Sequence, residues 1–377
     1  IIRALTPSSN GLEKRPKLRF PGFDEPWSIY KAEELFKNVA DKNHPMETVL
    51  TIIQGKGTLP REQAGRNIHY DDASLANYKK VEQGDFIIHL RSFEGGLEMA
   101  NEDGIVSPAY TILRCKKPHS SLFYEAYFHT DEFINHILSK SVEGIRDGRQ
   151  ISYEAFKWLG LPYCDVSEQE RIAQLFCTLS HRIEKQQQMV DALKKYKRGL
   201  IKLVFEKVMS EAHYQLPLSD LCISISSGRT TVNESNGRYP LFGSTGIVGM
   251  TNTIEHDGDI VMVARVGANA GKVNFFSGRC GVTDNTLVIR VKENTIHPKF
   301  LAYFLENFDL HKLIFGSGQP LVTGGQLKKI QSPVIAYKAQ LLITRSLESL
   351  DRIIGTQDTY MEKLIQLKSG LMQRLFI

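Results

Sequence analysis

Apolar residues recur in alternating steps of three and four along residues 167–206, which predicts a long helix packed against a second helix. Two polar residues, Gln186 and Lys197, interrupt this apolar seam. About 40 helical residues form a rod of roughly 60 Å, longer than the helices of most globular domains. The predicted seam consists of Ile172, Phe176, Leu179, Ile183, Gln186, Val190, Leu193, Lys197, Leu200 and Val204.

The same seam returns 171 positions later, in residues 338–377. Both polar interruptions recur there, as Gln357 and Lys368, so the two rods are interpreted as copies of one unit rather than as unrelated amphipathic helices. Polar seam positions fix the register of a helix pair, because a shifted pairing would bury them against apolar side chains. The second seam consists of Ile343, Leu347, Leu350, Ile354, Gln357, Met361, Leu364, Lys368, Leu371 and Leu375.

The ends of the rods predict how they pair. Ser167 and Glu170 form an S-x-x-E pattern, which predicts a capping box at the start of the first rod, and the second rod lacks this pattern. The connection 207–217 spans only about 40 Å when fully extended. A parallel second rod would require a return along roughly 60 Å of helix. We therefore expect the two rods to be antiparallel.

A second repeat relates the segments that precede the rods. Residues 84–90 and 258–263 each predict a turn that enters a strand, and the aromatic-rich residues 122–137 and 300–307 each predict a helix. This alignment pairs Arg91 with Arg265, because each follows its strand. The chain is therefore expected to be α+β, with two globular domains of mixed α and β structure in a pseudo-twofold arrangement, separated by two long antiparallel coiled-coil helices. The expected parts are a solvated basic tail (1–19), a first domain (20–162), a first rod (163–210), a second domain (211–334) and a second rod (335–377). The basic residues of the tail are Lys14, Arg15, Lys17 and Arg19.

Composition narrows the function without deciding it. The chain has 377 residues and a net charge of +5, which permits contact with nucleic acid. Its five cysteines never occur as C-x-x-C, and its histidines show no metal-ligand spacing, so we predict no disulfide framework and no metal site. No signal peptide or long apolar run is present, which predicts a cytoplasmic protein. Because Ile1 is not methionine, a short native N-terminus is expected to be missing.

Two short motifs resemble catalytic or cofactor-binding sequences. Residues 107–110, S-P-A-Y, approach the N/D/S-P-P-Y/F motif of DNA amino-methyltransferases but lack its second proline, and we interpret them as the entry to a strand. Residues 267–272, G-A-N-A-G-K, approach a phosphate-binding loop, but their glycines are one residue too close and Val273 replaces the magnesium-binding hydroxyl. We interpret them as a turn whose Lys272 can approach a DNA phosphate, and we predict no catalytic residues.

Over nearly its whole length the chain resembles a specificity subunit of a type I restriction-modification enzyme. The duplicated pattern of domain and helix is the specific part of this resemblance. The residues that carry it are L-R-F-P-G-F at 18–23, Trp27, E-R-I at 170–172, G-L at 199–200, Y-P-L-F-G at 239–243 and G-A-N-A-G-K at 267–272.

The resemblance implies two target recognition domains, each reading one half of a bipartite site in double-stranded DNA. It also implies that the rods set the gap between the half-sites and dock two modification subunits, through which restriction subunits join the complex. The assembled complex would be an adenine-N6 DNA methyltransferase and an ATP-dependent endonuclease, whereas this chain would be non-catalytic and would carry no cofactor. Two alternatives remain open: a fused or stand-alone DNA-modifying enzyme with similar recognition domains, and a coiled-coil adaptor that binds only proteins.

Basic and amide side chains near the predicted turns are the candidates for DNA contact, because Lys and Arg bind phosphates while Arg, Asn and Gln read base edges. Arg91 and Arg265 rank first among them. On the rods, the apolar residues Leu175 and Leu203 lie outside the seam and predict a docking surface. The DNA candidates are Lys56, Arg61, Arg66, His89 and Arg91 in the first domain, and Ser227, Arg229, Arg238, Arg265, Asn269 and Lys272 in the second.

Overall fold

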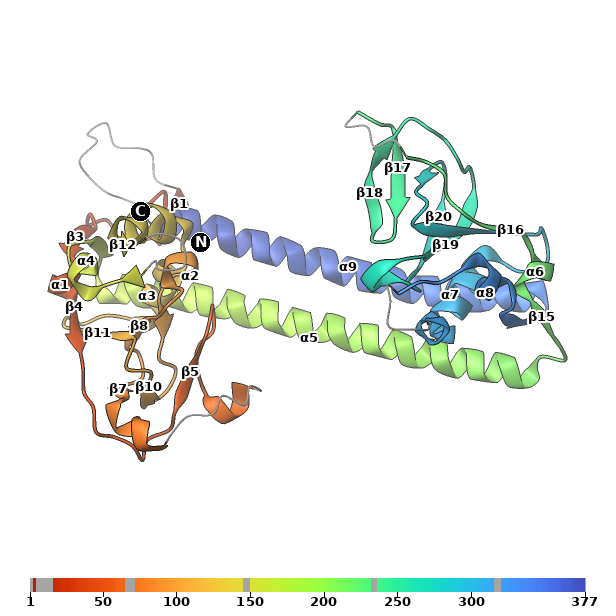
Figure 1. The fold of residues 1–377 in the computed structure, drawn as a ribbon. Helices are drawn as coiled ribbons and strands as arrows, with labels where there is room; N and C mark the ends of the chain where they lie inside the picture. The colour runs from red at the N-terminus through yellow and green to blue at the C-terminus, as the bar shows by residue number, and fades with distance from the viewer. Residues whose placement is uncertain are drawn as a thin grey trace. The chain divides into compact units, whose positions relative to one another are not determined.

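The fold is seen in a computed structural model that describes residues 3–4, 16–64, 72–144, 150–231, 236–314 and 320–376. The chain divides into two compact units, residues 1–186 with 360–377, and residues 187–359. Each unit contains one sheet-bearing domain and a part of both long helices. Figure 1 draws the long helices α5 (Val166–Glu211) and α9 (Tyr337–Leu375) without a break.

The two rods begin at equivalent positions, because the offset from Val166 to Tyr337 is the same offset that relates the two seams. The predicted capping box of the first rod is wrong. Helix α5 already includes Ser167, and Asp165 precedes the helix and accepts a hydrogen bond from the Ser167 backbone N–H at 2.9 Å. Hydrogen bonds from the Ser167 hydroxyl and backbone lower the pKa of Asp165, as expected for a carboxylate that caps a helix N-terminus.

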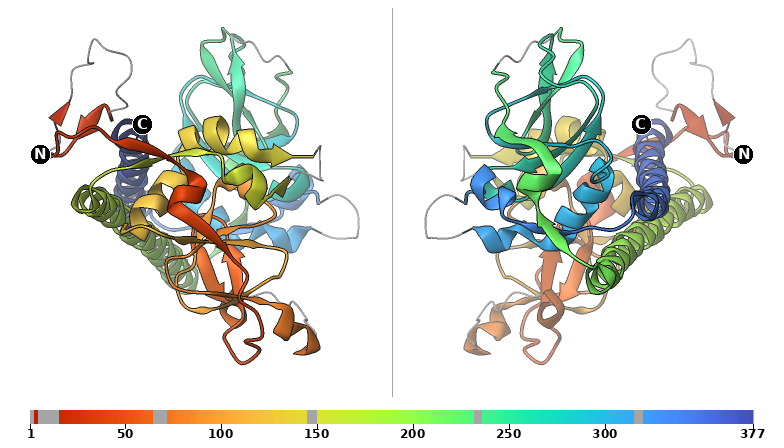
Figure 2. Two further views of the ribbon diagram at one scale, coloured as in Figure 1. Left: turned by 90° about the vertical axis from the view of Figure 1, so that its left-hand side faces the viewer. Right: turned by 90° about the vertical axis from the view of Figure 1, so that its right-hand side faces the viewer.

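The rods are antiparallel within each unit, as the short connection predicts. In the first unit, the rings of Phe176 and Phe376 are stacked with centroids 5.7 Å apart, and Lys368 Nζ donates to Ser180 Oγ at 2.7 Å. Residue numbers therefore rise along α5 while they fall along α9. In the second unit, Lys197 Nζ lies 2.8 Å from an Asp351 carboxylate oxygen. Figure 2, which turns the view of Figure 1 by 90° in either direction, also draws the two helices side by side.

All twenty seam positions predicted in the two rods are buried or half-buried. The polar residue Gln186 is only 7% exposed, so the seam continues through its polar position. The two apolar residues outside the seam differ from each other. Leu175 packs against the core of the first domain and is not part of an exposed docking surface, whereas Leu203 is 66% exposed.

The first domain is built on a four-stranded antiparallel sheet in the order β4-β11-β8-β9. Its strands are β3 (Ser28–Lys31), β4 (Phe36–Val39), β5 (Leu50–Ile53), β6 (Gly57–Pro60), β7 (Lys79–Val81), β8 (Phe86–Ile88), β9 (Glu98–Met99), β10 (Gly104–Val106), β11 (Thr111–Cys115), β12 (Val142–Glu143), β13 (Gln150–Ile151) and β14 (Gly160–Tyr163), with β1 (Arg3–Ala4) and β2 (Leu18–Arg19) before them. Its helices are α1 (Ala32–Leu35), η1 (Arg61–Ala64), η2 (Asp72–Asn77), α2 (Ser92–Gly95), α3 (Ser121–Phe128), η3 (Glu132–Ile137), η4 (Leu138–Ser141) and α4 (Tyr153–Phe156).

The second domain repeats this sheet in the order β16-β22-β19-β20 and adds a three-stranded sheet, β18-β17-β21. Its strands are β15 (Gln215–Pro217), β16 (Cys222–Ser227), β17 (Tyr239–Gly243), β18 (Gly246–Thr251), β19 (Asp259–Ala264), β20 (Val273–Ser277), β21 (Gly281–Val282), β22 (Thr286–Val291) and β23 (Gln331–Pro333). Its helices are α6 (Leu218–Leu221), η6 (Gly267–Asn269), α7 (Pro298–Phe308), η7 (Leu310–Leu313) and α8 (Gly324–Lys328).

The sheet register corrects one detail of the repeat. Phe86 pairs with Leu113, and Val261 pairs with Ile289. All four side chains lie on the sheet face that packs against the aromatic helix of their own unit. Phe86 is therefore equivalent to Val261, an offset of 175 rather than the 174 that pairs Arg91 with Arg265. A shift of one residue reverses the face of every side chain.

The predicted pairing of Arg91 with Arg265 is therefore wrong. In the register of the two sheets, Arg265 is equivalent to Leu90, and Arg91 is equivalent to Val266. The two arginines therefore follow their strands at positions that correspond to opposite faces of the sheet. The two domains thus share a scaffold but present different side chains at the end of the equivalent strand.

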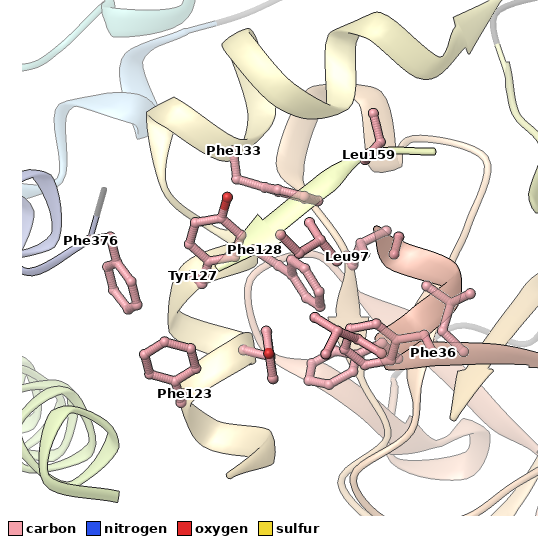
Figure 3. Packing of buried hydrophobic residues seen from close by; sticks show 14 of the residues in the cluster. Phe36, Leu97, Phe123, Tyr127, Phe128, Phe133, Leu159 and Phe376 are labelled. Atoms are coloured by element: carbon pink, nitrogen blue, oxygen red, sulfur yellow. The ribbon is translucent and has the colours of Figure 1, made fainter. Parts of the chain in front are cut away.

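Equivalent phenylalanines attach the C-terminal part of each rod to a domain. In Figure 3 the ring of Phe376 lies against Phe123 and Tyr127, with centroid distances of 5.3 and 5.5 Å. Phe205, its equivalent in the first rod, packs in the same way against Phe300 and Phe304 of α7, at 5.2 and 5.7 Å. Both phenylalanines are buried. The internal repeat therefore extends from the rods to their contacts with the domains.

Equivalent glutamines attach the N-terminal part of each rod. The Gln169 side chain accepts a hydrogen bond from the Ser120 backbone N–H at 3.0 Å and donates to the Cys164 carbonyl at 2.9 Å. Gln340 does the same with the His297 N–H at 2.7 Å and the Ile335 carbonyl at 3.0 Å. Ser120 and His297 precede α3 and α7, so each glutamine joins a rod to the start of an aromatic helix.

The N-terminal segment departs from the expected solvated tail where it can be described. Leu18 and Arg19 form the short strand β2, and Arg19 is only 4% exposed. The Arg19 guanidinium forms two hydrogen bonds, of 2.7 and 2.9 Å, to the fully buried Glu168 carboxylate of α5. The prediction of a solvated basic residue is therefore wrong for Arg19. The other basic residues of the tail ahead of Lys17 that the sequence singles out, Lys14 and Arg15, lie outside the described ranges.

Candidate nucleic-acid interface

In the second domain, three loops meet at one end of the central sheet. The Arg265 backbone N–H donates to the Asn285 carbonyl at 2.9 Å, just before β22 begins. The Gly228 N–H donates to the Thr286 carbonyl at 3.0 Å, which places the end of β16 at the same edge. The structure thus brings together the loops that carry the predicted residues Ser227, Arg229 and Arg265. Arg229 is exposed, and Ser227 and Arg265 are half-buried.

Glu255 holds the Arg229 loop in place. Its carboxylate accepts hydrogen bonds from the backbone N–H groups of Arg229, at 2.9 Å, and Thr230, at 3.1 Å. It also accepts one from the Thr230 hydroxyl at 2.7 Å. The Arg229 backbone is therefore fixed while its side chain remains exposed. This is the arrangement that a residue needs to present a cation to DNA in a defined direction.

Residues 267–272 form the tight turn that the sequence predicts. Gly271 has a φ of +88° and donates a hydrogen bond to the Ala264 carbonyl at 2.8 Å, which closes the turn between β19 and β20. Lys272 is exposed and Asn269 is half-buried. The predicted residue Arg238 is also exposed, but it precedes β17 and so belongs with the three-stranded sheet.

In the first domain, His89 and Arg91 follow β8. Arg91 is exposed, and its backbone N–H donates to His89 Nδ1 at 3.3 Å. The His89 ring lies 6.4 Å from the ring of Tyr110. Burial lowers the pKa of His89, which favours a neutral imidazole rather than a phosphate-binding cation. Tyr110 ends the turn from Ser107 that leads into β11, so the interpretation of residues 107–110 as a strand entry is confirmed.

Lys56 and Arg61 lie on either side of β6. Lys56 is exposed in the turn between β5 and β6. The guanidinium carbon of the half-buried Arg61 lies 5.8 Å from the centre of the Tyr78 ring, within the range of a cation–π contact. Arg66, the remaining candidate of this domain, lies outside the described residues.

Glu98 holds the Lys56 turn as Glu255 holds the Arg229 loop. The buried Glu98 carboxylate accepts hydrogen bonds from the backbone N–H groups of Gly55, at 2.7 Å, and Gly57, at 2.9 Å. His129 Nε2 lies 3.3 Å from the same carboxylate. Burial alone would raise the pKa of Glu98, but the hydrogen bonds from His129 and the two glycines lower it below its usual range. Burial alone would lower the pKa of His129, whereas Glu98 raises it.

These opposite pKa shifts predict a pH window in which the Glu98–His129 pair stabilises the first domain. A carboxylate whose pKa is lowered on folding stabilises the folded domain fully above about pH 4.5. This stabilisation is lost as the pH falls through the pKa of the carboxylate in the folded state. A histidine whose pKa is raised on folding stabilises the folded domain fully below about pH 6.5. This stabilisation is lost as the pH rises through the pKa of the histidine in the folded state. We expect the difference in melting temperature between wild type and Glu98→Gln to be largest between these limits. A difference that does not change with pH, or one matched by the exposed control Glu94→Gln, would contradict this.

Sequence reasoning missed Glu98 and Glu255, which position backbone rather than contact a ligand. Neither residue belongs to a motif, and their partners are backbone N–H groups that are distant in the sequence. The only local signal is the pair Gly55 and Gly57, both of which have positive φ, at +75° and +76°, and mark a tight turn. In the part of the chain that the structure describes, no group of three potential metal ligands is found. Nor is any described helix long and apolar enough to span a membrane.

Comparison with known proteins addresses the second domain most directly. Residues 215–364, which cover most of that domain and much of α9, match the family described as the type I restriction modification DNA specificity domain. The EcoprrI specificity subunit of Escherichia coli is 28% identical over 123 residues, 33% of this chain and 30% of that protein. Residues 215–364 thus carry the sequence features of a type I restriction modification DNA specificity domain. The MjaVIII specificity subunit of Methanocaldococcus jannaschii is 28% identical over 156 residues, 38% of this chain and 36% of that subunit. The chain thus spans about a third of the length of these two curated relatives.

Solved structures of specificity subunits share the fold over a longer stretch than the sequences do. The crystal structure of a type I S subunit from M. genitalium matches with a TM-score of 0.63 and 13% identity, covering 97% of this chain and 99% of that one. A second structure, from work on assembly and conformational transition of a type I system, matches with a TM-score of 0.57 and 15% identity, covering 94% and 98%. At these identities the likeness supports the specificity-subunit fold and leaves the site residues to the geometry of this chain.

Proposed function

We propose that this chain is a type I specificity subunit that recognises a bipartite site in double-stranded DNA, one half with each domain. The observation that carries the proposal is the duplication itself. Two sheets of identical strand order are joined to rods that begin at equivalent repeat positions, through equivalent glutamines and phenylalanines. Two similar readers on one repeated helical unit suit a target made of two separated parts. The differing residues after β8 and β19 suit two half-sites of different sequence.

Within each domain, DNA is contacted from the loops at the end of the central sheet. The exposed cations Lys56 and Lys272 bind phosphates in this proposal, and Arg91, Arg229 and Arg265 read base edges. Glu98 and Glu255 fix two of these loops before DNA binds, which lowers the cost of ordering them in the complex. A binding titration with the natural DNA site and a modification subunit tests the proposal. Equal affinity for the site and for a scrambled duplex would reject it.

Arg265 carries the sharpest prediction about base recognition. If its guanidinium reads a guanine, Arg265→Ala costs about 1–3 kcal/mol at one base position of one half-site and leaves the other half-site unchanged. Competition binding with duplexes that differ by single base pairs measures this. Arg290→Ala is the matched control, because Arg290 is exposed on β22 and pairs with Ser224 away from the loops. An Arg265 variant with wild-type base preference and salt dependence would remove this residue from the interface.

The rods are proposed to dock two modification subunits, and restriction subunits join through that complex. Support comes from exposed apolar residues at equivalent repeat positions of both rods. Met189 is equivalent to Tyr360, and Tyr196 to Leu367, and all four side chains are at least 38% exposed. Matching apolar surfaces on both rods suit two copies of one partner.

Charge on this surface should abolish docking. We expect Tyr196→Glu combined with Leu367→Glu to prevent pull-down of the modification subunit, because a carboxylate would be desolvated in the interface. Both side chains are exposed, so the variant should keep the melting temperature of wild type. Lys195→Glu with Gln366→Glu, at exposed neighbouring positions, is the control. Wild-type recovery of the modification subunit by the apolar-site variant would reject this docking surface.

In this account the chain is non-catalytic and has no cofactor of its own. The partner subunits supply adenine-N6 methylation and ATP-dependent cleavage, and the complex acts on DNA in the cytoplasm. A fused or stand-alone DNA-modifying enzyme is the alternative, and methyl transfer by the isolated chain would establish it. A protein-only adaptor is the other, and absence of DNA binding at low salt in the presence of modification subunit would favour it.

A further inference from the structure

The two rods place their seam lysines in different surroundings. Lys197 in the second unit is neutralised by carboxylates, because its Nζ lies 2.8 Å from Asp351 and 3.5 Å from Glu306. Lys368, its repeat equivalent in the first unit, donates to the Ser180 hydroxyl at 2.7 Å. Ser180 and Asp351 are themselves equivalent positions of the repeat. The repeat has therefore kept the lysine and exchanged its carboxylate partner for a hydroxyl.

No carboxylate within the described ranges lies within 4.0 Å of Lys368 Nζ. Burial lowers the pKa of Lys368, which is opposed by the charge of Glu125 at longer range. Burial likewise raises the pKa of Glu125, and the charges of His129 and Lys368 act against this shift. A half-buried ammonium without a close anion is costly, and an added carboxylate would relieve that cost.

A cavity of about 490 Å³ lies beside Lys368, within the first unit. Its walls come from α3, α5 and α9, with Gly55 of the β5–β6 turn at one side. Leu122, Ala126, Phe176 and Met372 supply apolar surface. The polar lining includes Lys368 and Ser180 on the rods, and Glu125 and His129 at the end of α3. This volume falls in the range of small-molecule sites, and a mostly apolar wall with a few convergent polar groups is their usual composition.

The equivalent place in the second unit carries carboxylates of the chain itself. Asp351 replaces Ser180, accepts a hydrogen bond from the Tyr303 hydroxyl at 2.5 Å and pairs with Lys197. Glu348 replaces Cys177 and lies 3.9 Å from Lys299 Nζ. The second unit thus shows which group completes this site: a carboxylate held by the seam lysine.

We propose that the cavity beside Lys368 binds an organic carboxylate with an apolar tail. The carboxylate accepts hydrogen bonds from Lys368 and Ser180, as Asp351 does from Lys197 and Tyr303 in the second unit. The tail lies along Leu122, Phe176 and Met372. The bound molecule joins α3 to both rods, so it stabilises the attachment of the first domain.

Octanoate is a suitable probe, with 1-octanol as the uncharged control of equal chain length. Calorimetric titration of the full chain should show one octanoate site and at least tenfold weaker binding of 1-octanol. Ser180→Asp brings the carboxylate of the second unit into the first, so this variant should bind octanoate at least tenfold more weakly and melt no lower than wild type. Lys368→Met should lose the site as well. The exposed Lys363→Met on the same helix should bind as wild type does.

Three results would overturn the proposal. One is absence of octanoate binding to the wild-type chain. Another is equal affinity for octanoate and 1-octanol, which would mean that the lysine does not select the ligand. The last is wild-type octanoate affinity in Ser180→Asp, which would place any binding elsewhere. Because Ser180→Asp retains both the lysine and its packing, the test holds even if Lys368→Met fails to fold.

Discussion

Arg19→Ala is expected to destabilise the first unit by about 3–5 kcal/mol, the usual effect of removing one partner from a buried ion pair. Glu168 is fully buried at the start of α5 and accepts both Arg19 hydrogen bonds. It also accepts a hydrogen bond from Trp27 Nε1 at 3.0 Å. Without Arg19, the Glu168 carboxylate would remain buried without its charged partner. Urea unfolding of the full chain, followed by far-ultraviolet circular dichroism, measures the loss.

The exposed arginine on the same helix, Arg171, is the matched control. Arg171→Ala should change the unfolding free energy by less than about 0.5 kcal/mol, as surface substitutions usually do. Replacing the whole triad with apolar residues, as Arg19→Met, Glu168→Leu and Trp27→Phe, should recover much of the loss, because no unpaired charge then remains. A single Arg19→Ala variant as stable as the Arg171 control would show that the pair does not hold this unit together.

Insertion of seven residues into both rods should lengthen the gap between the half-sites and leave their sequences unchanged. One heptad preserves the seam and adds about 10 Å to a helix, which corresponds to about three base-pair steps of DNA. Suitable points are between Met189 and Val190 in α5 and between Tyr360 and Met361 in α9. These points are equivalent in the repeat. Mapping of methylated adenines in cells that carry the variant and its modification subunit reads out the new gap.

A heptad placed in one rod alone is the control for this experiment. It shifts the two seams relative to each other and sets the polar position Gln186 or Gln357 against apolar partners, so the variant should lose stability. The double insertion should keep the melting temperature of wild type, because both rods lengthen together. An unchanged gap in a stable double insertion would mean that the rods support the domains without measuring the distance between them.

The rods were predictable because their pattern of apolar residues is local and occurs twice in the chain. A 3.5-residue apolar period predicts the helix, and the recurrence of Gln186 and Lys197 as Gln357 and Lys368 predicts the seam, all of which is buried or half-buried. The antiparallel order followed from the reach of a short connection. The helix start was not predictable in detail, because Asp165 and Ser167 are both good capping residues and only the backbone shows which one caps.

The strands of the two domains were predictable from the sequence. The residue-by-residue equivalence of the two sheets was less predictable. The apolar runs ending at Ile88 and Val263 are strands in both domains, but a strand buried on both faces gives no alternation from which to read its face. The one-residue error that paired Arg91 with Arg265 follows from this. Contacts such as Arg19 with Glu168, 149 residues apart, depend on tertiary packing that no local pattern encodes.

The basic residues of the candidate interface were predictable from the sequence, but the residues that hold its loops in place were not. Basic residues next to turn signals predicted Lys56, Arg229 and Arg265, and the structure places these residues in loops, with Arg229 and Arg265 at the end of the second sheet. Glu98 and Glu255 were not predicted because a buried carboxylate that binds backbone N–H groups has no sequence signature.

The central claim is that one chain reads two half-sites, one with each domain. Mapping methylated adenines across the DNA of cells that carry this chain and its modification subunit tests it most directly. The account predicts one bipartite motif, with two specified half-sites on either side of a gap of fixed length and unspecified sequence. A single uninterrupted motif, or a methylation pattern unchanged when this chain is removed, would contradict it.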